Sequence, residues 1–345
     1  MANALTAFRR IQLSNVEGTP GVAEAATEVL GGAVMTAAYS DLVIHQPIQD
    51  RTSLSRNLAD DFVVGNEAAL SIEGNLNTRV AAFLFCNAVC GNITPTQPDA
   101  TTEPLSYLWT FAPGIITANT PDIAEGIDTF TIEFGDNIQD YEVEYCFATS
   151  ISITGSPNEP VRYTWEMIGR QVTETTLTGG LVIVATQHFL SNLTKFYVDA
   201  TYAGIGGTQK AGLLLEWTWT LETMFTPRYG ADGALYFSGV NEDRKNVELE
   251  LTYLRSTASE LEKDKYDART TTYLRIELLG ATAMDSGQAN PPHIYLDGAF
   301  RYTEWPETDD ADGMQTVTVT AQSVYDSVGA KEYGVILFTN LAAFA

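Results

Sequence analysis

Alternation of apolar and polar residues is the feature that most limits how this 345-residue chain can fold. In segment 129–134 the apolar residues Phe130, Ile132 and Phe134 share one face, and Thr and Glu take the other. A period of two is the spacing of side chains on one face of a β-strand. The pattern recurs in segments 161–167, 213–221, 247–253, 273–279 and 316–321. We therefore predict a mostly antiparallel, all-β fold.

Two segments break the alternation and are predicted to form short helices. The first runs from Thr78, the predicted N-cap, to Cys90, and Gly91 is placed to end it. The second, 256–267, contains a predicted capping box at Thr257–Glu260. The predicted class is thus all-β with two short helices.

The two halves of the chain present these elements in the same order. Each has a long excursion, 41–66 or 225–246, followed by an alternating strand, a helix and further strands. We match 67–74 with 247–254, 106–112 with 273–279, 128–134 with 294–302, and 161–168 with 316–321. The offset drifts from about 180 to about 155 residues, as insertions would produce.

This order predicts a tandem duplication, with domains at 1–178 and 179–345 and a joint near 177–181, where Gly-rich sequence interrupts the strands. The alternative is that an all-β chain produces such an order by accident, since residue identities barely match between the halves.

The charge of the chain argues against tight binding to DNA. The sequence has 44 Asp and Glu against 19 Lys and Arg, for a net charge of −25. A surface this acidic repels phosphate instead of releasing counterions from it. The N-terminus has no secretion-signal pattern, so we expect synthesis in a cytoplasm, and no apolar run approaches the ~20 residues of a membrane span.

The cysteines and histidines predict neither a disulfide framework nor a metal site. The three cysteines, Cys86, Cys90 and Cys146, are an odd number and are expected to be small buried groups. Cys86 and Cys90 would share a helix face, but a tetrahedral metal needs two further ligands. No companion cluster is offered by His45, His188 or His293. We predict no metal and no cofactor.

Motifs of common catalytic sites are missing from the sequence. The stretch GIGGTQK at 204–210 fits neither dinucleotide-binding nor P-loop spacing and is interpreted as a strand connection. Neither GxSxG nor HExxH occurs. The densest acidic site comprises Glu307, Asp309, Asp310 and Asp312.

Paired carboxylates can act as acid and base, and with Gly313 this acidic run loosely resembles a calcium loop. However, Thr308 and Val319 stand where the loop pattern requires acidic residues. We interpret the run as a solvated turn and predict that the chain is not an enzyme.

Several segments follow one another in an order with a known counterpart. Segment 8–32 has an extended stretch, then Glu17, a Thr-Pro-Gly turn at 19–21 and an Ala/Thr-rich stretch. Segment 129–170 has a strand, Gly-Asp, a Tyr and Cys strand, Ser/Ile alternation and a Trp strand closing on Gly-Arg. Its key residues are Gly135, Asp136, Cys146, Trp165, Gly169 and Arg170.

With the helix and strand at 256–280 and the ending from 317 to 341, this ordered set resembles the major tail tube proteins of long-tailed, siphovirus-type bacteriophages, in a two-domain form. No single motif is diagnostic, and the likeness covers nearly the whole chain. It implies a sandwich or barrel-like β-fold with a flanking helix, whose subunits join sheets side by side into rings that stack into a tube.

The resemblance implies a structural virion protein of the phage tail, the major subunit of a non-contractile tail tube. Its partners would be further copies of itself, a tape-measure protein, and tail-tip and terminator proteins. Two domains per chain would let three chains form a pseudo-sixfold ring, so we predict a homotrimer. DNA would pass through an acidic lumen during ejection without tight binding.

The two long excursions are predicted to contact the next ring. They exceed ordinary hairpin lengths and carry both signs of charge, and in relatives a comparable loop reaches toward the neighbouring ring. The alternative is a mobile surface loop. The candidate contact residues are Arg51, Arg56, Asp60, Asp61, Arg228 and Asp232.

Two other function classes are kept as alternatives. The first is another virion or surface β-protein, such as a decoration or host-binding module, which would remain a closed oligomer. The second is a carboxylate-pair glycan hydrolase that uses Glu307 and Asp310.

Overall fold

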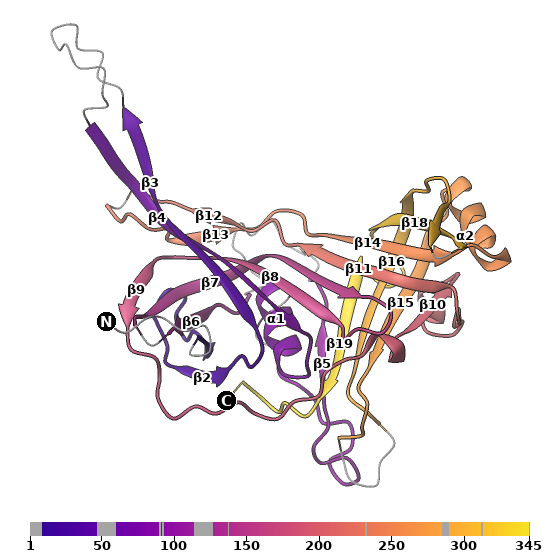
Figure 1. The fold of residues 1–345 in the computed structure, drawn as a ribbon, viewed down its shortest axis with the longest axis horizontal. Helices are drawn as coiled ribbons and strands as arrows, with labels where there is room; N and C mark the ends of the chain where they lie inside the picture. The colour runs from indigo at the N-terminus through magenta and orange to yellow at the C-terminus, as the bar shows by residue number, and fades with distance from the viewer. Residues whose placement is uncertain are drawn as a thin grey trace, which may run out of the picture.

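A computed structural model describes residues 9–46, 60–89, 91, 93–113, 127–136, 138–231, 233–284, 290–311 and 313–344. Within this part of the chain, strands dominate: a 17-stranded network is linked by antiparallel ladders, and a 2-stranded sheet accompanies it. The two α-helices are α1 (Val80–Ala88) and α2 (Thr257–Asp267) (Figure 1). The predicted all-β class with two short helices is confirmed.

The N-cap of each helix lies one residue from the predicted one, at Arg79 for α1 and at Ser256 for α2. At α1 it is Asn77, not Thr78, whose Oδ1 accepts hydrogen bonds from the backbone N–H groups of Arg79 and Val80, each at 3.0 Å. At α2 the capping box joins Ser256 and Ser259 instead of Thr257 and Glu260. Ser256 has extended backbone, as an N-cap requires, whereas Thr257 is already helical.

The strands fall into two sets that follow one another along the chain. The first set is β1 (Arg10–Val16), β2 (Ala26–Val29), β3 (Val34–Gln46), β4 (Asp60–Asn75), β5 (Tyr107–Phe111), β6 (Phe130–Gly135), β7 (Asp140–Gly155), β8 (Arg162–Gly169) and β9 (Val172–Thr175).

The second set begins after a stretch of the chain that has little regular structure. It is β10 (Lys195–Asp199), β11 (Leu214–Glu222), β12 (Thr226–Arg228), β13 (Gly239–Asn241), β14 (Asn246–Leu254), β15 (Thr272–Leu279), β16 (His293–Glu304), β17 (Asp309–Ala311), β18 (Met314–Ser323) and β19 (Tyr333–Thr339). Short 3-10 turns, η2 (Ser191–Leu193) and η3 (Tyr202–Gly204), flank β10.

The two sets pair in the same order. In the first, the ladder runs β1–β6–β7–β8–β4–β3, and β9 is added to the N-terminal part of β7. In the second, it runs β10–β15–β16–β18–β14–β11, and β19 is added to the N-terminal half of β16. The helix follows β4 in the first set and β14 in the second.

The correspondence extends to an irregularity in the ladders. The register shifts between Ala148 and Ser150 where β7 pairs with β8, and between Tyr302 and Glu304 where β16 pairs with β18. The register shift in the second set lies 154 residues after the register shift in the first set. A bulge bends its strand and increases the local twist, so the two sheets are bent at matching points.

Pairing corrects the strand correspondence inferred from the sequence. The pairing partners show that β6 corresponds to β15 and that β7 corresponds to β16. The sequence comparison instead matches segment 106–112 with 273–279, which is β15. Segment 106–112 is β5, which pairs with β19 of the other set. The sequence comparison missed β7 because its bulge and the positive φ of Tyr145 (57°) interrupt the period of two.

The two sets share one sheet, because strands of the first pair with strands of the second. The C-terminal half of β7 has β8 on one side and β11 on the other, with Ile153 opposite Trp219. A second link joins β5 to β19, where Val335 lies opposite Phe111. Figure 1 shows the sets side by side, with the β3–β4 ladder at one end and α2 at the other.

Gly155 allows close approach where the two sets meet. A Cβ added there would lie 2.4 Å from Nε1 of the buried Trp217 on β11. We expect Gly155→Ala to lower the free energy of unfolding by about 1–3 kcal/mol, because the indole or the strand must shift. Chemical denaturation measures this. The control is Gly179→Ala, where an added Cβ meets nothing within 4 Å. Equal losses in both variants would contradict the tight joint.

Candidate functional site

The shared sheet has one apolar face and one hydrophilic face. Its strand order is β3–β4–β8–β7–β11–β14–β18–β16. On β11, for example, Trp217, Trp219 and Leu221 are buried, and the residues between them point away from the core. The apolar face packs on the two helices and the outer strands, while the hydrophilic face is left open.

Carboxylates and hydroxyls line this hydrophilic face. Six strands, β4, β8, β7, β11, β14 and β18, have described positions that face away from the core. One cation, Arg162, occurs at these positions, together with a group of glutamates. These are Glu73, Glu166, Glu216, Glu222, Glu248 and Glu250. We call them the face glutamates.

Each face glutamate has a Ser or Thr directly across a strand pair. Glu250 lies opposite Thr218 and Thr320, and Glu166 lies opposite Ser71 and Ser150. Ser150 donates a hydrogen bond to Glu222 at 3.2 Å. The face is therefore acidic and hydrated, with no pair of like charges directly opposite one another at these positions.

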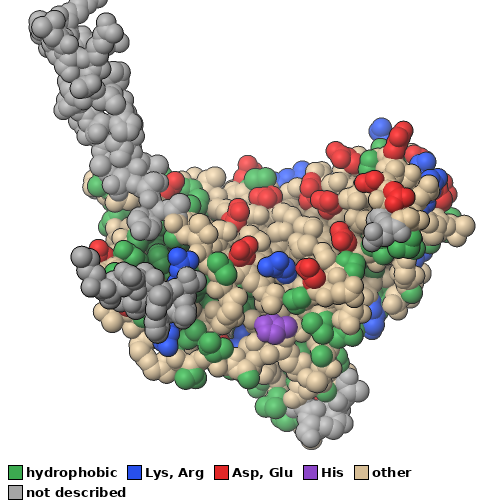
Figure 2. All heavy atoms as spheres, in the orientation of Figure 1, with side chains coloured by type: hydrophobic (Ala, Val, Ile, Leu, Met, Phe, Trp, Pro, Cys, Tyr) green, Lys and Arg blue, Asp and Glu red, His purple; other side chains and the backbone are tan. Residues whose placement is uncertain are grey.

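Such a face can repel polyanions. Closely spaced carboxylates on a sheet produce a negative potential that keeps phosphate away, and salt screens it beyond about 10 Å at 0.1 M. Figure 2 shows acidic side chains gathered over the region that holds β11, β14 and α2 in Figure 1. The sequence predicted outward carboxylates along the strands but not that strands of both halves would place them on one surface.

Each end of the shared sheet has an unpaired edge in the described residues. At one end, β3 pairs with β4 and has no strand on its other side. At the other end, β16 pairs with β15 only as far as Phe300, so the outer edge of residues 301–309 is open. An exposed strand edge is a template for pairing with another chain.

The structure corrects the extent of the first predicted excursion. Segments 41–46 and 60–66 are not loop but continue β3 and β4, with Asp60 opposite Gln46 and Asp61 opposite His45. Arg51 and Arg56 lie outside the described residues. Contact with the next ring therefore stays a prediction for all of these residues.

The second excursion folds back on the first set of strands. Its hairpin β12–β13 carries Arg228, whereas Asp232 is outside the described residues. Phe225, Phe237 and Val240 enclose Phe147 of β7 in a small apolar cluster. No pattern in the sequence predicts this packing, since the segment stands out only by its length and its mixed charge.

Arg170, one of the residues that carry the resemblance, holds the same excursion in place. Its guanidinium lies over the rings of Tyr145 and Tyr236, at 5.2 Å and 4.6 Å from their centres. It also donates hydrogen bonds to the carbonyl oxygens of Phe237 and Gly21. Arg170 thus links the end of β8 to the N-terminal turn and to the second excursion, and holds these segments in position.

The acidic run at 307–310 is exposed and belongs to a hairpin. Asp309 and Asp310 begin β17, which turns into β18 with Ala311 opposite Met314. Asp310 accepts a hydrogen bond from the backbone N–H of Gly313 at 3.0 Å, as in a turn. Asp312 is outside the described part. Among the described residues, no group of three or more His, Cys, Asp or Glu is placed to hold a metal ion.

The cysteines behave as the sequence predicted where they are described. Cys86 in α1 and Cys146 in β7 are fully buried and are not in a disulfide. Burial raises the pKa of the Cys146 thiol well above its usual value. Cys90 is outside the described residues.

Comparisons with known proteins return no family for this chain. No family model matches the sequence, and no curated protein matches it. In the described residues, no helix is long and apolar enough to cross a membrane. The geometry of the shared sheet is therefore the main guide to function.

Proposed function

We propose that this chain is the major subunit of a non-contractile phage tail tube, built from two tail-tube-type β domains in tandem. The proposal is carried by the shared sheet, which crosses from one set of strands to the other and ends in an open edge on each side. A chain with two different open edges can add copies head to tail, and such heterologous contacts make rings when the rotation closes.

The matching pairing order of the two sets supports a trimeric ring. If each set is one module, three chains supply six modules, and the joint within a chain resembles the joint between chains. The β7–β11 ladder within one chain then has the same arrangement as every joint around the ring. Closing the sheet also removes its exposed edges, which a stable soluble assembly requires.

The hydrophilic face supports the role of a DNA conduit. In a closed ring, the helices and outer strands cover one face of the shared sheet, and the face glutamates line the other. DNA carries about one charge per 1.7 Å of its axis, so an acidic wall holds it away and lets it slide. Before DNA passes, the lumen would hold a tape-measure protein, and tail-tip and terminator proteins would close the ends.

Electron microscopy of the purified protein tests the proposal. Concentrated material is expected to form hollow filaments of stacked rings, each ring with the mass of three chains in native mass spectrometry. A decoration or host-binding protein would instead give one closed oligomer that does not stack. Failure to form filaments at high protein concentration, with or without tail-tip components, would contradict the tube assignment.

The glycan-hydrolase alternative is tested separately. Glu307 and Asp310 are both exposed. Sugar release by the unaltered protein that disappears in Glu307→Gln and Asp310→Asn would revive that alternative.

A further inference from the structure

The contacts within one chain can be used to infer the contacts between chains. Of the contacts that join the first set of strands to the second, three involve an element with a counterpart in the other set. The counterparts are exposed or unfilled in the single chain. Because this inference names the surfaces that would join copies in a ring, it rests on the proposed function.

The first contact is the strand ladder. Residues 150–155 of β7 pair with β11, just beyond the point where β7 leaves β6 at Cys146. The counterpart of this stretch is 304–310, just beyond the point where β16 leaves β15 at Phe300. Asp309 corresponds to Thr154, because Asp309 pairs with Thr316 of β18 as Thr154 pairs with Arg162 of β8. The counterpart of β11 is β3, and both of these sites are open edges in the described chain.

The second contact places a helix beneath the joining strand. Phe85 of α1 meets Trp219 of β11 edge to face, with ring centres 6.2 Å apart. All nine residues of α1 are buried, whereas α2 buries only Ser259 and Glu262. The outer side of α2 includes Leu261, whose side chain is 58% exposed, although it belongs to a structured helix.

The positions on the two helices can be aligned through their caps. The side chains of Asn77 and Ser256 each accept a hydrogen bond from the backbone N–H three residues later. These two residues are 179 residues apart, as are the strand positions Ile72 and Leu251 that precede them. By this spacing Asp264 stands where Phe85 stands in α1. Leu261 lies one turn earlier on the same side of α2.

The third contact is made by the residues that follow β19. Phe344 packs on Phe83 of α1, with ring centres 4.6 Å apart, and on Phe130 of β6. The counterpart of β19 is β9, and the counterpart of the segment after it is 179–184. Here Val182 and Ile183 are 75% and 68% exposed.

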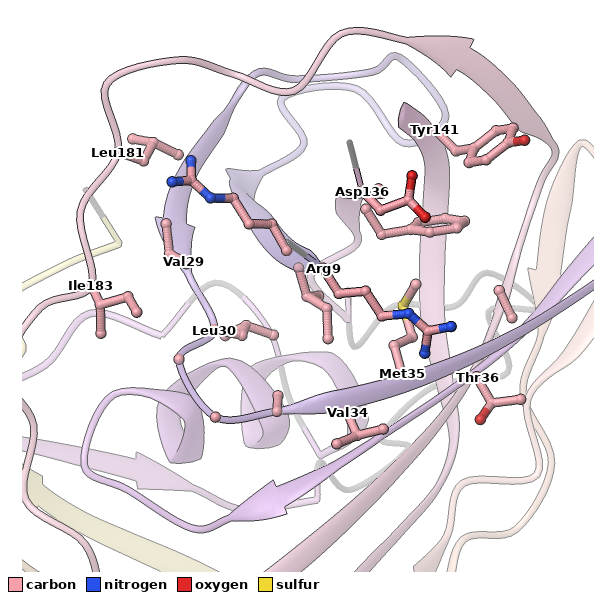
Figure 3. Close-up of a pocket in the computed structure, with 18 of the residues that line it drawn as sticks. Arg9, Val29, Leu30, Val34, Met35, Thr36, Asp136, Tyr141, Leu181 and Ile183 are labelled. Atoms are coloured by element: carbon pink, nitrogen blue, oxygen red, sulfur yellow. The ribbon is translucent and has the colours of Figure 1, made fainter. Parts of the chain in front are cut away.

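An open cavity lies where these counterparts meet. It has a volume of about 1080 Å³ and lies along the free side of β3 (Figure 3). Its apolar wall includes Leu30, Val34, Met35, Val182 and Ile183. In the second set, the space beside β11 is filled by α1 and β5 of the first set.

The charges of the two surfaces are opposite in net sign. Arg9, Arg10 and Asp136 line the cavity, and Figure 3 shows the Arg9 side chain extended across it. The exposed charged residues of α2 are Glu260, Lys263, Asp264 and Asp267. α2 itself is firmly placed, since its buried Glu262 accepts hydrogen bonds from Lys265 and from Tyr302 of β16.

We infer that the cavity beside β3 is the docking site for α2 of a second copy of this chain, with Leu261 inserted against Val182 and Ile183, while β3 pairs with residues 304–310 of that copy. The register follows from the joint within the chain, where Thr218 lies opposite Thr154. Thr36 of one copy then lies opposite Asp309 of the next.

Single charged substitutions test the helix contact. Leu261→Asp and Val182→Asp each place a carboxylate in the apolar contact and should weaken self-association by roughly tenfold or more, measured by sedimentation. Both side chains are exposed in the single chain, so thermal unfolding at low protein concentration should match the unaltered protein. The control, Val328→Asp, changes an 80% exposed residue outside the proposed contact and should associate normally.

Cysteine cross-linking tests the strand register. Thr36→Cys with Asp309→Cys should give covalent dimers and trimers on oxidation, because β3 and the β17–β18 hairpin are at opposite ends of one chain (Figure 1). The matched pair Thr36→Cys with Asp310→Cys should react much less, since neighbouring strand residues point to opposite faces.

The outcomes separate this inference from the proposed function. Cross-linked trimers that never stack into tubes would support the joint and contradict the tube. Tubes that form normally with both aspartate variants, and without the 36–309 cross-link, would overturn the joint and leave the tube assignment standing.

Discussion

Glu17→Ala is expected to lower the free energy of unfolding by about 3–5 kcal/mol, because it leaves several buried donors without their charged acceptor. Glu17 is 4% exposed. Its Oε1 accepts from the Thr131 hydroxyl and the Tyr145 backbone N–H, each at 2.8 Å. Its Oε2 accepts from the Thr129 hydroxyl at 2.8 Å and the Gly21 backbone N–H at 2.9 Å.

These bonds fix the N-terminal turn to β6 and β7. The N–H of Tyr145 points to Glu17 because Tyr145 adopts a left-handed backbone conformation, with φ of 57°. That conformation is costly for a non-glycine residue, so the carboxylate compensates for local strain. Loss of the carboxylate therefore affects the packing of β1 on β6 as well as the turn.

Equilibrium denaturation of Glu17→Ala and of an exposed control, Glu24→Ala, measures the effect. The control lies in the same turn region and is expected to change the free energy of unfolding by less than about 0.5 kcal/mol. Similar small changes in both variants would show that the buried carboxylate is not needed to hold the N-terminal turn.

Reversing the charge of the hydrophilic face is expected to convert a surface that repels DNA into one that binds it. The triple variant Glu166→Lys, Glu216→Lys and Glu250→Lys changes β8, β11 and β14 without touching the core. Binding of a short DNA duplex to assembled protein, measured by co-sedimentation, should be negligible for the unaltered protein. For the variant it should be clear at ~50 mM salt and fall by roughly 10³ or more by 200 mM if at least six phosphates are neutralised.

A second triple variant provides the matched control. Glu24→Lys, Glu159→Lys and Asp243→Lys change the net charge equally at exposed positions off the hydrophilic face. These lysines are scattered, so DNA binding should be much weaker than when lysines line the hydrophilic face. If both triples bind DNA equally, the face has no special relation to a lumen, and only the overall charge matters.

The local structure follows closely from sequence patterns where the period of two is regular. The segments predicted at 128–134 and 161–168 are β6 and β8, with ends that differ by one or two residues. The prediction was less accurate at helix caps, because adjacent polar residues such as Asn77 and Thr78 compete for one role. The Tyr and Cys strand and the Ser/Ile alternation described within 129–170 together form β7, but the match between the two halves left this strand out, because a bulge and the positive φ of Tyr145 interrupt its alternation.

The candidate site was predictable only in part. Alternation indicated that the glutamates of 247–253 would point outward, and they do on β14. It could not indicate that β14 and β8 would share a sheet through β7 and β11, since those strands belong to different halves. The tail-tube resemblance and the tandem domains stay predictions.

The sequence by itself determined which face of each strand is buried, where the helices interrupt the strands, and that the surface is acidic, because these depend on local periodicity and composition. The tertiary structure alone decided which strand edges meet, which edges stay open, and that a cavity lies beside β3 while Leu261 of α2 is exposed. Strand pairing joins residues far apart in the chain, and a period of two is satisfied equally well by many partners.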